Sequence, residues 1–431
     1  MTPDPAFLDS NIKTYTFTVA GQNFAIINDG NDGLLAGSLA ETRSWEPWHL
    51  DVYARVIRRG SVCLDVGGNI GTSALAMAVF AAEGHVYSFE PVEHTFAFLR
   101  RNVEQNAVAN VTPVQLGLSD GPGEAEIVVD RTMLGNARQL TPGERINLAD
   151  RGMRYVQTIR LEGLDRWMRS AGVSHAGFIK VDVEGHEIEV LAGGAAAFAH
   201  PGTVAIFEFA VAPQRKAGST VFPEMPRDVL FFRALSGRFP YLFLMGRDSR
   251  LHRVGSYAQL RCLMIAGDQV DDLLCCHTVP EGLGDAVAGA APLPVREWGT
   301  ALSGPAGVFV LLNRYDDGWS LGTPAVITGT RSGLCAVLAE PVELTLEFGP
   351  VYTKHSERAA HPVMLAVNED VRFHDVTDRA STVTVPLKAG TNWLFLESEY
   401  ALEARSYLGN PGDPRTVGFR FVLSGLERGL G

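Results

Sequence analysis

The sequence predicts an α/β domain built on a doubly wound, mostly parallel sheet, followed by an all-β sandwich domain. Three observations support this prediction. Short apolar stretches alternate with helical stretches from residue 61 to residue 209, and from residue 298 strand-like runs follow one another with turn residues between them and hardly any helical period. The chain also has 431 residues, more than one hydrophobic core usually holds. We therefore expect separate domains.

Four segments are expected in chain order. Residues 1–55 should form a β-hairpin and a helix that pack on the α/β domain, because residues 14–35 alternate apolar and polar positions around a glycine-containing turn. Residues 56–279 should form the α/β domain itself. Residues 280–297, rich in Gly, Ala and Pro, should be a linker, and residues 298–431 a sandwich with a jelly-roll-like arrangement.

Composition and charge exclude several classes of protein. The chain carries 49 acidic and 37 basic residues, a formal charge of −12. Such a surface repels phosphate backbones and anionic lipid on average, so we expect no nucleic acid partner. The sequence lacks the run of about 20 apolar residues that a membrane span requires, and Met1–Ser10 lack the features of a signal peptide. The five cysteines are odd in number and show no metal-binding spacing, so we expect them to be reduced. Together with the lack of a signal peptide and of a membrane span, this makes the cytoplasm the expected location.

A glycine-rich turn follows the first predicted strand of the α/β domain. Residues 65–71 read Asp-Val-Gly-Gly-Asn-Ile-Gly and precede a helix of small apolar residues. The glycines allow a sharp turn close to a ligand, and the helix N-terminus offers unpaired N–H groups. Asn69 stands where a dinucleotide-binding fingerprint has its second glycine, and no lysine follows as in a phosphate-binding loop. The next strand ends at Glu90, whose carboxylate can accept both hydroxyls of a ribose.

Several different short motifs lie at the ends of the predicted strands. They are Asp65-Val66-Gly67-Gly68-Asn69-Ile70-Gly71, Phe89-Glu90-Pro91, Leu118-Ser119-Asp120 and Ile179-Lys180-Val181-Asp182-Val183-Glu184-Gly185-His186-Glu187, with Trp45-Glu46-Pro47 before the first strand. Together, over about residues 40–210, they resemble the FkbM family of S-adenosylmethionine-dependent O-methyltransferases. One departure is Gly68, because alanine is more usual there.

The resemblance implies a Rossmann-like class I methyltransferase domain with S-adenosylmethionine as cofactor. It also implies which residues bind that cofactor. The methionine part is assigned to Asp65, Gly67, Gly68, Asn69 and Gly71, the ribose to Glu90, and the adenine to Ser119 and Asp120.

The last of these motifs places three charges on one side of a predicted strand. Side chains alternate along a strand, so Lys180, Asp182 and Glu184 share one side. The implied reaction is attack of a substrate hydroxyl on the sulfonium methyl group, helped by a base that removes the proton. We expect His186, Asp182, Lys180 and Glu184 to be the catalytic residues, with Asp182 also on the cofactor side. His186 is the first candidate for the base, and its alternative roles are to position the substrate or to cap the following helix.

We expect the reaction to need no metal. The alternative is a divalent cation, because Asp182 and Glu184 offer hard oxygen ligands that would place it where it lowers the pKa of the hydroxyl. Glu208, at the end of the next predicted strand, is a candidate third acidic group, with a solvated strand end as its alternative.

Two short motifs of the last domain, Asp317-Gly318-Trp319 and the segment 413–419, resemble β-modules appended to bacterial glycosyltransferases. This second resemblance implies a carbohydrate or glycoconjugate acceptor, as in polysaccharide biosynthesis. A homo-oligomer or a glycosyltransferase partner stays open, and the module either binds glycan or only supports assembly. Two other functions also stay open: a glycan-binding protein whose methyltransferase sheet has lost its activity, and a nucleotide-sugar or NAD enzyme on a similar sheet.

Overall fold

The computed structural model describes residues 11–139, 154–211, 225–266, 269–287, 300–304, 307–312, 326–329, 331–348, 360–377, 381–398 and 419–424. Contacts between Cα atoms divide the chain into two units. Unit 1 comprises residues 1–216, 230–252 and 271–287, and unit 2 comprises residues 217–229, 253–270 and 288–431. Each unit has sheets of its own.

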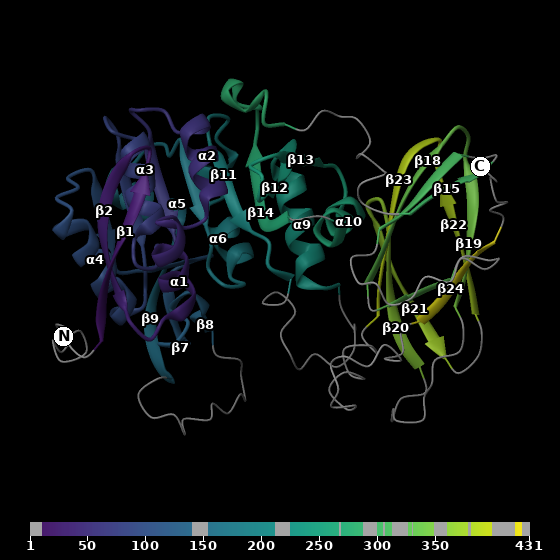
Figure 1. Ribbon diagram of the computed structural model, residues 1–431, viewed down its shortest axis with the longest axis horizontal. Helices are drawn as coiled ribbons and strands as arrows, with labels where there is room; N and C mark the ends of the chain where they lie inside the picture. Colours follow the sequence, from purple (N-terminus) through teal and green to yellow (C-terminus); the bar gives the residue numbers. More distant parts are fainter. Residues whose placement is uncertain are drawn as a thin grey trace. The chain divides into compact units, whose positions relative to one another are not determined.

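Unit 1 is built on an eight-stranded sheet with the order β13-β12-β14-β11-β10-β3-β4-β5 (Figure 1). Its strands are β3 (Val62–Val66), β4 (His85–Phe89), β5 (Val111–Val114), β10 (Phe178–Val181), β11 (Val204–Glu208), β12 (Tyr241–Gly246), β13 (Leu251–Val254) and β14 (Gln269–Cys276). The strands from β11 to β5 run parallel, and β14 pairs antiparallel with β11. The predicted mostly parallel sheet is confirmed.

Helices alternate with these strands along the chain. They are α3 (Thr72–Phe80), α4 (Glu93–Gln105), α5 (Leu164–Ala171), α6 (Glu187–Gly193), α7 (Ala195–Ala199) and α9 (Arg227–Arg238). Every residue of β10 is buried, and so is every residue of β3 after Val62. Successive residues of a strand face opposite sides, so both faces of the central sheet are covered. This explains why these strands read as continuous apolar runs in the sequence.

The N-terminal segment forms the expected hairpin and packs on α4. Its elements are β1 (Ile12–Val19), β2 (Gln22–Asp29), α1 (Gly33–Thr42) and α2 (Pro47–Val56). The hairpin turns at Ala20 and Gly21, which both have positive φ angles. The buried side chain of Asn102 in α4 accepts from the backbone N–H of Ile27 at 2.8 Å and donates to its carbonyl at 3.0 Å. These two hydrogen bonds fix the hairpin to the sheet domain.

A second, four-stranded sheet of unit 1 has the order β6-β9-β7-β8. Its strands are β6 (Gly117–Ser119), β7 (Gly123–Asp130), β8 (Arg138–Gln139) and β9 (Arg154–Gly163). Ile127, Val129 and Ile159 of this sheet form a small core with Val92. Residues 140–153, between β8 and β9, lie outside the described residues.

Unit 2 contains two antiparallel sheets, which Figure 1 shows as two layers. The first has the order β15-β16-β18-β23-β20-β21 and the second the order β17-β24-β19-β22. Their strands are β15 (Thr300–Gly304), β16 (Gly307–Leu312), β17 (Val326–Gly329), β18 (Arg331–Leu338), β19 (Val342–Phe348), β20 (Ala360–Val367), β21 (Asp370–Thr377), β22 (Ser381–Leu387), β23 (Gly390–Ser398) and β24 (Phe419–Ser424). The predicted all-β domain is confirmed. The motif at residues 317–319 and most of that at 413–419 lie outside the described residues.

Helix α10 (Tyr257–Ala266) belongs to unit 2 and contacts β18 and β23. Two segments that the sequence placed in the α/β domain, 217–229 and 253–270, therefore group with the sandwich, and the last segment of unit 2 begins at Ala288. Among the helices that the structure describes, none is long and apolar enough to cross a membrane.

Candidate active site

The glycine-rich turn leaves β3 at the carboxyl edge of the sheet and lies against the turn that follows β10. Gly67 has a φ angle of +89°, and a Cβ atom there would lie 1.8 Å from the carbonyl oxygen of Asp182. A Cβ atom on Gly68 would lie 2.0 Å from Oγ of Ser88. Only glycine lets the two turns approach so closely. An alanine at position 68 would require Ser88 to move.

Asp65 lies beneath this turn and not in a cavity wall. It is fully buried, and its Oδ2 accepts a hydrogen bond of 2.7 Å from Oγ of Ser88. Gly71 ends the turn as the N-cap residue of α3. Both residues therefore shape the turn, and neither lines the cavity, although the sequence assigned them to the cofactor.

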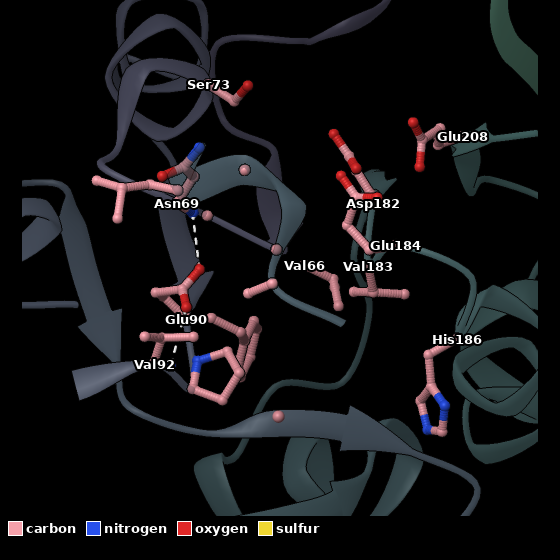
Figure 2. A pocket seen from close by; sticks show the side chains of 18 of the residues that line it. Val66, Asn69, Ser73, Glu90, Val92, Asp182, Val183, Glu184, His186 and Glu208 are labelled. Carbon is pink, nitrogen blue, oxygen red and sulfur yellow. Dashed lines mark hydrogen bonds between the residues drawn. The ribbon is translucent and has the colours of Figure 1, made fainter. Parts of the chain in front are cut away.

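Two buried glutamates hold the turns at this edge. Glu90 is 6% exposed, and its carboxylate accepts from the backbone N–H of Asn69 at 3.0 Å and of Val92 at 2.9 Å (Figure 2). Burial raises the pKa of Glu90 to about 8. Oε1 of Glu187 likewise accepts from the backbone N–H of Val183 at 3.1 Å. A carboxylate has about four acceptor positions, so Glu90 keeps room for the two ribose hydroxyls expected from the sequence.

Three carboxylates meet at the ends of β10 and β11, and we call them the acidic wall. Oxygens of Asp182, Glu184 and Glu208 all lie within 4.8 Å of one another (Figure 2). Lys180, 3% exposed, donates from Nζ to Oδ2 of Asp182 at 2.7 Å. Oε2 of Glu208 is buried and has no hydrogen-bond partner within the described chain. The fold thus brings together Lys180, Asp182, Glu184 and Glu208, which the sequence names as candidates. Strand β10 ends at Val181, so Asp182 and Glu184 lie in the turn that follows it, although the sequence predicts them on the strand itself.

Repulsion within the acidic wall changes its proton affinities. Burial and the carboxylate of Asp182 raise the pKa of Glu184 to about 8 and the pKa of Glu208 to about 11. Although burial alone lowers the pKa of Lys180, Asp182 and Glu46 raise it well above its usual range. Lys180 is therefore charged, while the carboxylates disfavour one another's ionisation. The spacing of the wall is also one that a divalent cation can use.

A further carboxylate, Glu46, reaches the same cavity from the N-cap position of α2. Its Oε2 lies 2.7 Å from Nδ1 of His49, and Nε2 of His49 lies 3.1 Å from Oδ2 of Asp272. Although burial alone lowers the pKa of His49, Asp272 and Glu46 raise it to about 10. Burial alone would raise the pKa of Glu46, but His49 and Lys180 lower it to about 2. Glu46 is thus an ionised group to which the sequence assigned no role. Its signals were the motif Trp45-Glu46-Pro47 and the proline at the first helical position.

Three residues that line the cavity have left-handed backbone conformations. Glu46 and Asn69 each have a φ angle of 46°, and Glu184 has a φ angle of 54°. Residues other than glycine rarely adopt this conformation, and it persists where the surrounding structure fixes it. Such residues concentrate at ligand sites, so their meeting around one cavity supports a binding role.

These groups surround a cavity of about 320 Å³. This volume lies within the range of small-molecule sites. In the view of Figure 2, Asn69 and Glu90 lie on one side and the acidic wall on the other. Apolar side chains from the second sheet and its neighbourhood complete the lining; they include Leu116, Leu118, Ile127, Ile159 and Leu161.

Ser119 and Asp120 do not line this cavity, although the sequence placed them beside an adenine; among the described residues of β6, Gly117 and Leu118 do. Side chains alternate along β6, so Ser119 faces away from Leu118. Its Oγ hydrogen-bonds instead with Nε2 of His186 at 2.9 Å. Nδ1 of His186 lies 3.5 Å from Oε2 of Glu189, and the ring points away from the acidic wall (Figure 2). Both ring nitrogens of His186 are therefore engaged by protein groups.

Comparison with known proteins identifies the domain that contains this cavity. The sequence profile of the Methyltransferase FkbM domain matches residues 65–230. The chain contains an FkbM methyltransferase domain. The resemblance seen in the motifs is thereby confirmed, whereas the resemblance of the sandwich to glycosyltransferase modules stays a prediction.

Among curated proteins, hexuronic acid methyltransferase AglP from Haloferax volcanii is 32% identical over 133 residues, which are 31% of this chain and 49% of AglP. Methyltransferase sdnD from Sordaria araneosa is 28% identical over 153 residues, covering 30% of this chain and 59% of sdnD. The chain thus spans about half the length of the curated relatives it matches.

Two solved structures that the chain resembles are less similar to it in sequence. Methyltransferase FkbM from Methylobacillus flagellatus has a TM-score of 0.31 and 15% identity, over 51% of this chain and 44% of that one. The O-methyltransferase TomG from Streptomyces achromogenes, solved in complex with SAM, has a TM-score of 0.30 and 13% identity, over 54% of this chain and 79% of that one.

The residues of the cavity fit S-adenosylmethionine, the cofactor expected from the sequence. The volume is that of a cofactor site, Glu90 has free acceptor positions, and the apolar lining offers a surface for a base. The buried Oδ1 of Asn69 has no hydrogen-bond partner in the part of the chain that the structure describes. A polar ligand group in this cavity would provide one.

Proposed function

We propose that the chain is an S-adenosylmethionine-dependent O-methyltransferase that methylates a hydroxyl group of a sugar in a glycan or glycoconjugate, and that it acts in the cytoplasm. One observation carries the proposal: within the FkbM domain, the glycine-rich turn, Glu90 and the acidic wall meet around one cavity at the carboxyl edge of the parallel sheet. Ligands bind at this edge in open α/β sheets. The name of AglP, a hexuronic acid methyltransferase, supports a sugar acceptor.

When bound, S-adenosylmethionine supplies an electrophilic methyl group. In our proposal the residues of this chain hold that cofactor and the acceptor in line. Glu90 accepts from the ribose hydroxyls, and Asn69 and the N-terminus of α3 face the methionine part. Leu118 and Ile127 offer apolar surface for the adenine, while Ser119 supports this side through His186. Lys180 holds the carboxylate of Asp182 in place through its hydrogen bond of 2.7 Å.

The transfer needs an acceptor for one proton. The cofactor would supply the methyl group to the acceptor's hydroxyl oxygen, its sulfur would leave with the electron pair of the broken carbon–sulfur bond, and the hydroxyl proton would pass to a base of this chain. An effective base has a pKa near the working pH. The pKa of Glu184 is raised to about 8, and both nitrogens of His186 are engaged, so Glu184 is our first candidate and His186 the alternative.

The turnover of two variants distinguishes between the two candidate bases. Glu184→Gln should lower turnover at saturating cofactor by about 10²–10⁴-fold, the usual contribution of general base catalysis, while His186→Ala should lower it less than about tenfold. The measurement is transfer of a labelled methyl group to sugar acceptors. The opposite ranking of the two variants would assign the base to His186.

The first experiment on the proposal itself is a calorimetric titration with S-adenosylhomocysteine, the product of the cofactor. We expect one molecule to bind per chain. Glu90→Gln should weaken this binding about tenfold, because the amide nitrogen of glutamine cannot accept the hydrogen bonds that a carboxylate oxygen accepts. Glu104→Gln, which removes an exposed carboxylate next to Arg100, is the matched control and should bind like the wild type. No binding at millimolar concentration would contradict the proposed function.

A further inference from the structure

The polar lining of the cavity is strongly unbalanced in charge. Its described acidic residues are Asp32, Glu46, Glu90, Asp182, Glu184 and Glu208, whereas Lys180 is the one lysine or arginine among the described lining residues. That lysine is already paired with Asp182 at 2.7 Å. The cavity therefore offers carboxylates to a ligand and little positive charge.

The charge is most concentrated in the acidic wall. Three carboxylates whose oxygens lie within 4.8 Å of one another repel each other, and partial burial strengthens this repulsion. Oε2 of Glu208 has no hydrogen-bond partner within the described residues, so these residues alone do not satisfy the wall. Burial and mutual repulsion favour the neutral forms of Glu184 and Glu208. A positive ligand group in this cavity would favour their ionised forms, and a neutral group of the same shape would not.

The two forms of the cofactor differ in this respect. S-adenosylmethionine carries a sulfonium charge, whereas S-adenosylhomocysteine has a neutral thioether at the same atom. Their adenosine, ammonium and carboxylate groups are the same. A comparison of the two forms therefore isolates the response of the cavity to one positive charge.

We infer that the acidic wall makes the cavity selective for positive charge, so that the protein binds the sulfonium form of the cofactor more tightly than the thioether form. This inference rests on the proposed function and deepens it. Methyl transfer removes the positive charge for which the wall selects. The protein therefore binds the product S-adenosylhomocysteine more weakly, which favours its exchange for S-adenosylmethionine.

The test is calorimetric and needs no acceptor. The full-length protein, kept in EDTA, is titrated with S-adenosylmethionine, with S-adenosylhomocysteine and with sinefungin, an analogue in which an ammonium group replaces the methylsulfonium group. We expect both cationic ligands to bind about tenfold or more tightly than S-adenosylhomocysteine, the effect of one charge near partly buried carboxylates.

Variants assign the selectivity to the wall. Glu208→Gln, alone and combined with Glu184→Gln, should reduce the ratio of the two affinities severalfold, while the affinity for S-adenosylhomocysteine changes less than about twofold. Glu104→Gln is the matched control, since it removes an exposed carboxylate outside the cavity lining, and it should keep the ratio.

The outcomes separate this inference from the proposed function. Equal affinity for all three ligands, or an unchanged ratio in the wall variants, would overturn the selectivity and leave the cofactor assignment intact. Equal weakening of all three ligands in the variants would also overturn it, because it would show a structural role of the wall. Absence of binding by every ligand would overturn both.

Discussion

Buried charge is organised differently in the two units. In unit 2 the side chain of Arg261, 2% exposed, lies 3.1 Å from Oδ2 of Asp228 and 3.4 Å from Oε1 of Glu397. The hydroxyl of Tyr257 donates to the same oxygen of Asp228. In unit 1 the acidic wall gathers carboxylates that face one another, with Lys180 paired only to one of them.

The difference shows how to read buried charges in a fold. The charges of unit 2 contact oppositely charged partners within the protein, so they are parts of the scaffold. In the acidic wall, burial and Asp182 raise the pKa of Glu184 and Glu208, and an oxygen of Glu208 has no partner among the described residues, which is the pattern expected of a ligand site. Four predictions test this contrast.

The largest effect is expected in unit 2. Arg261→Met leaves two buried carboxylates without their guanidinium partner, so it should lower the free energy of unfolding by about 3–5 kcal/mol. Urea unfolding followed by circular dichroism measures this loss. Arg100→Met breaks an exposed pair with Glu104 and should cost less than about 1 kcal/mol. A loss at Arg261 no larger than at Arg100 would refute the scaffold role.

The second prediction concerns His49, which pairs with Glu46 of the cavity lining. The folded pKa of His49 is raised to about 10, above the value near 6.5 in the unfolded chain, so its contribution to stability is complete below pH ~6.5 and is lost as the pH rises toward 10. His49→Gln should therefore cost about 2–3 kcal/mol at pH 6 and progressively less at higher pH. Unfolding curves from pH 6 to pH 9 test the slope, with His85→Gln as the control. A pH-independent difference would show that His49 is not a buried cation.

The third prediction concerns Glu208, whose replacement should stabilise the protein. The folded pKa of Glu208 is raised to about 11, so its contribution is present below the unfolded pKa of ~4.3 and is lost above it. Glu208→Gln should therefore leave stability unchanged at pH 4 and raise it by about 1–2 kcal/mol at pH 8, measured in EDTA by thermal unfolding. A destabilised variant at pH 8 would mean that Glu208 is paired like the charges of unit 2.

The smallest effect is expected from metal removal. We expect the acidic wall to bind the cationic cofactor and to hold no resident metal. EDTA should therefore change the rate of methyl transfer by less than about twofold. Activity that is lost in EDTA and restored by magnesium would instead identify the wall as a cation site. That result would also settle the alternative that the sequence left open for Asp182 and Glu184.

Much of unit 1 is predictable because its signals are local. The alternation of buried strands and helices and the turn at residues 65–71 each depend on neighbouring residues, and they predict the sheet and the edge where a ligand binds. Lys180 lies in β10, whereas Asp182 and Glu184 lie in the turn after it, where Glu184 has a left-handed backbone, so alternation along a strand explains only the position of Lys180. Their convergence with Glu208 follows from the parallel pairing of β10 with β11.

The rest depends on contacts between distant residues. Residues 258–265 read as a strand, yet they lie in helix α10, because almost every position is buried and no polar face reveals the helical period. The side of the sheet toward which the side chain of Ser119 points depends on the register of a three-residue strand, β6. Glu46 enters the cavity through a left-handed backbone turn and a pairing with His49 and Asp272, and sequence spacing encodes neither.

The left-handed residues around the cavity have a consequence for attempts to stabilise this protein. At Glu46, Asn69 and Glu184 the backbone conformation costs about 1–2 kcal/mol relative to glycine. A search that rewards melting temperature alone would therefore favour glycine at Asn69 and Glu184, whereas the pairing of Glu46 with His49 opposes it at position 46. Each such exchange would remove a polar side chain from the cavity, so thermostable variants selected in that way would be expected to lose ligand binding as they gain stability.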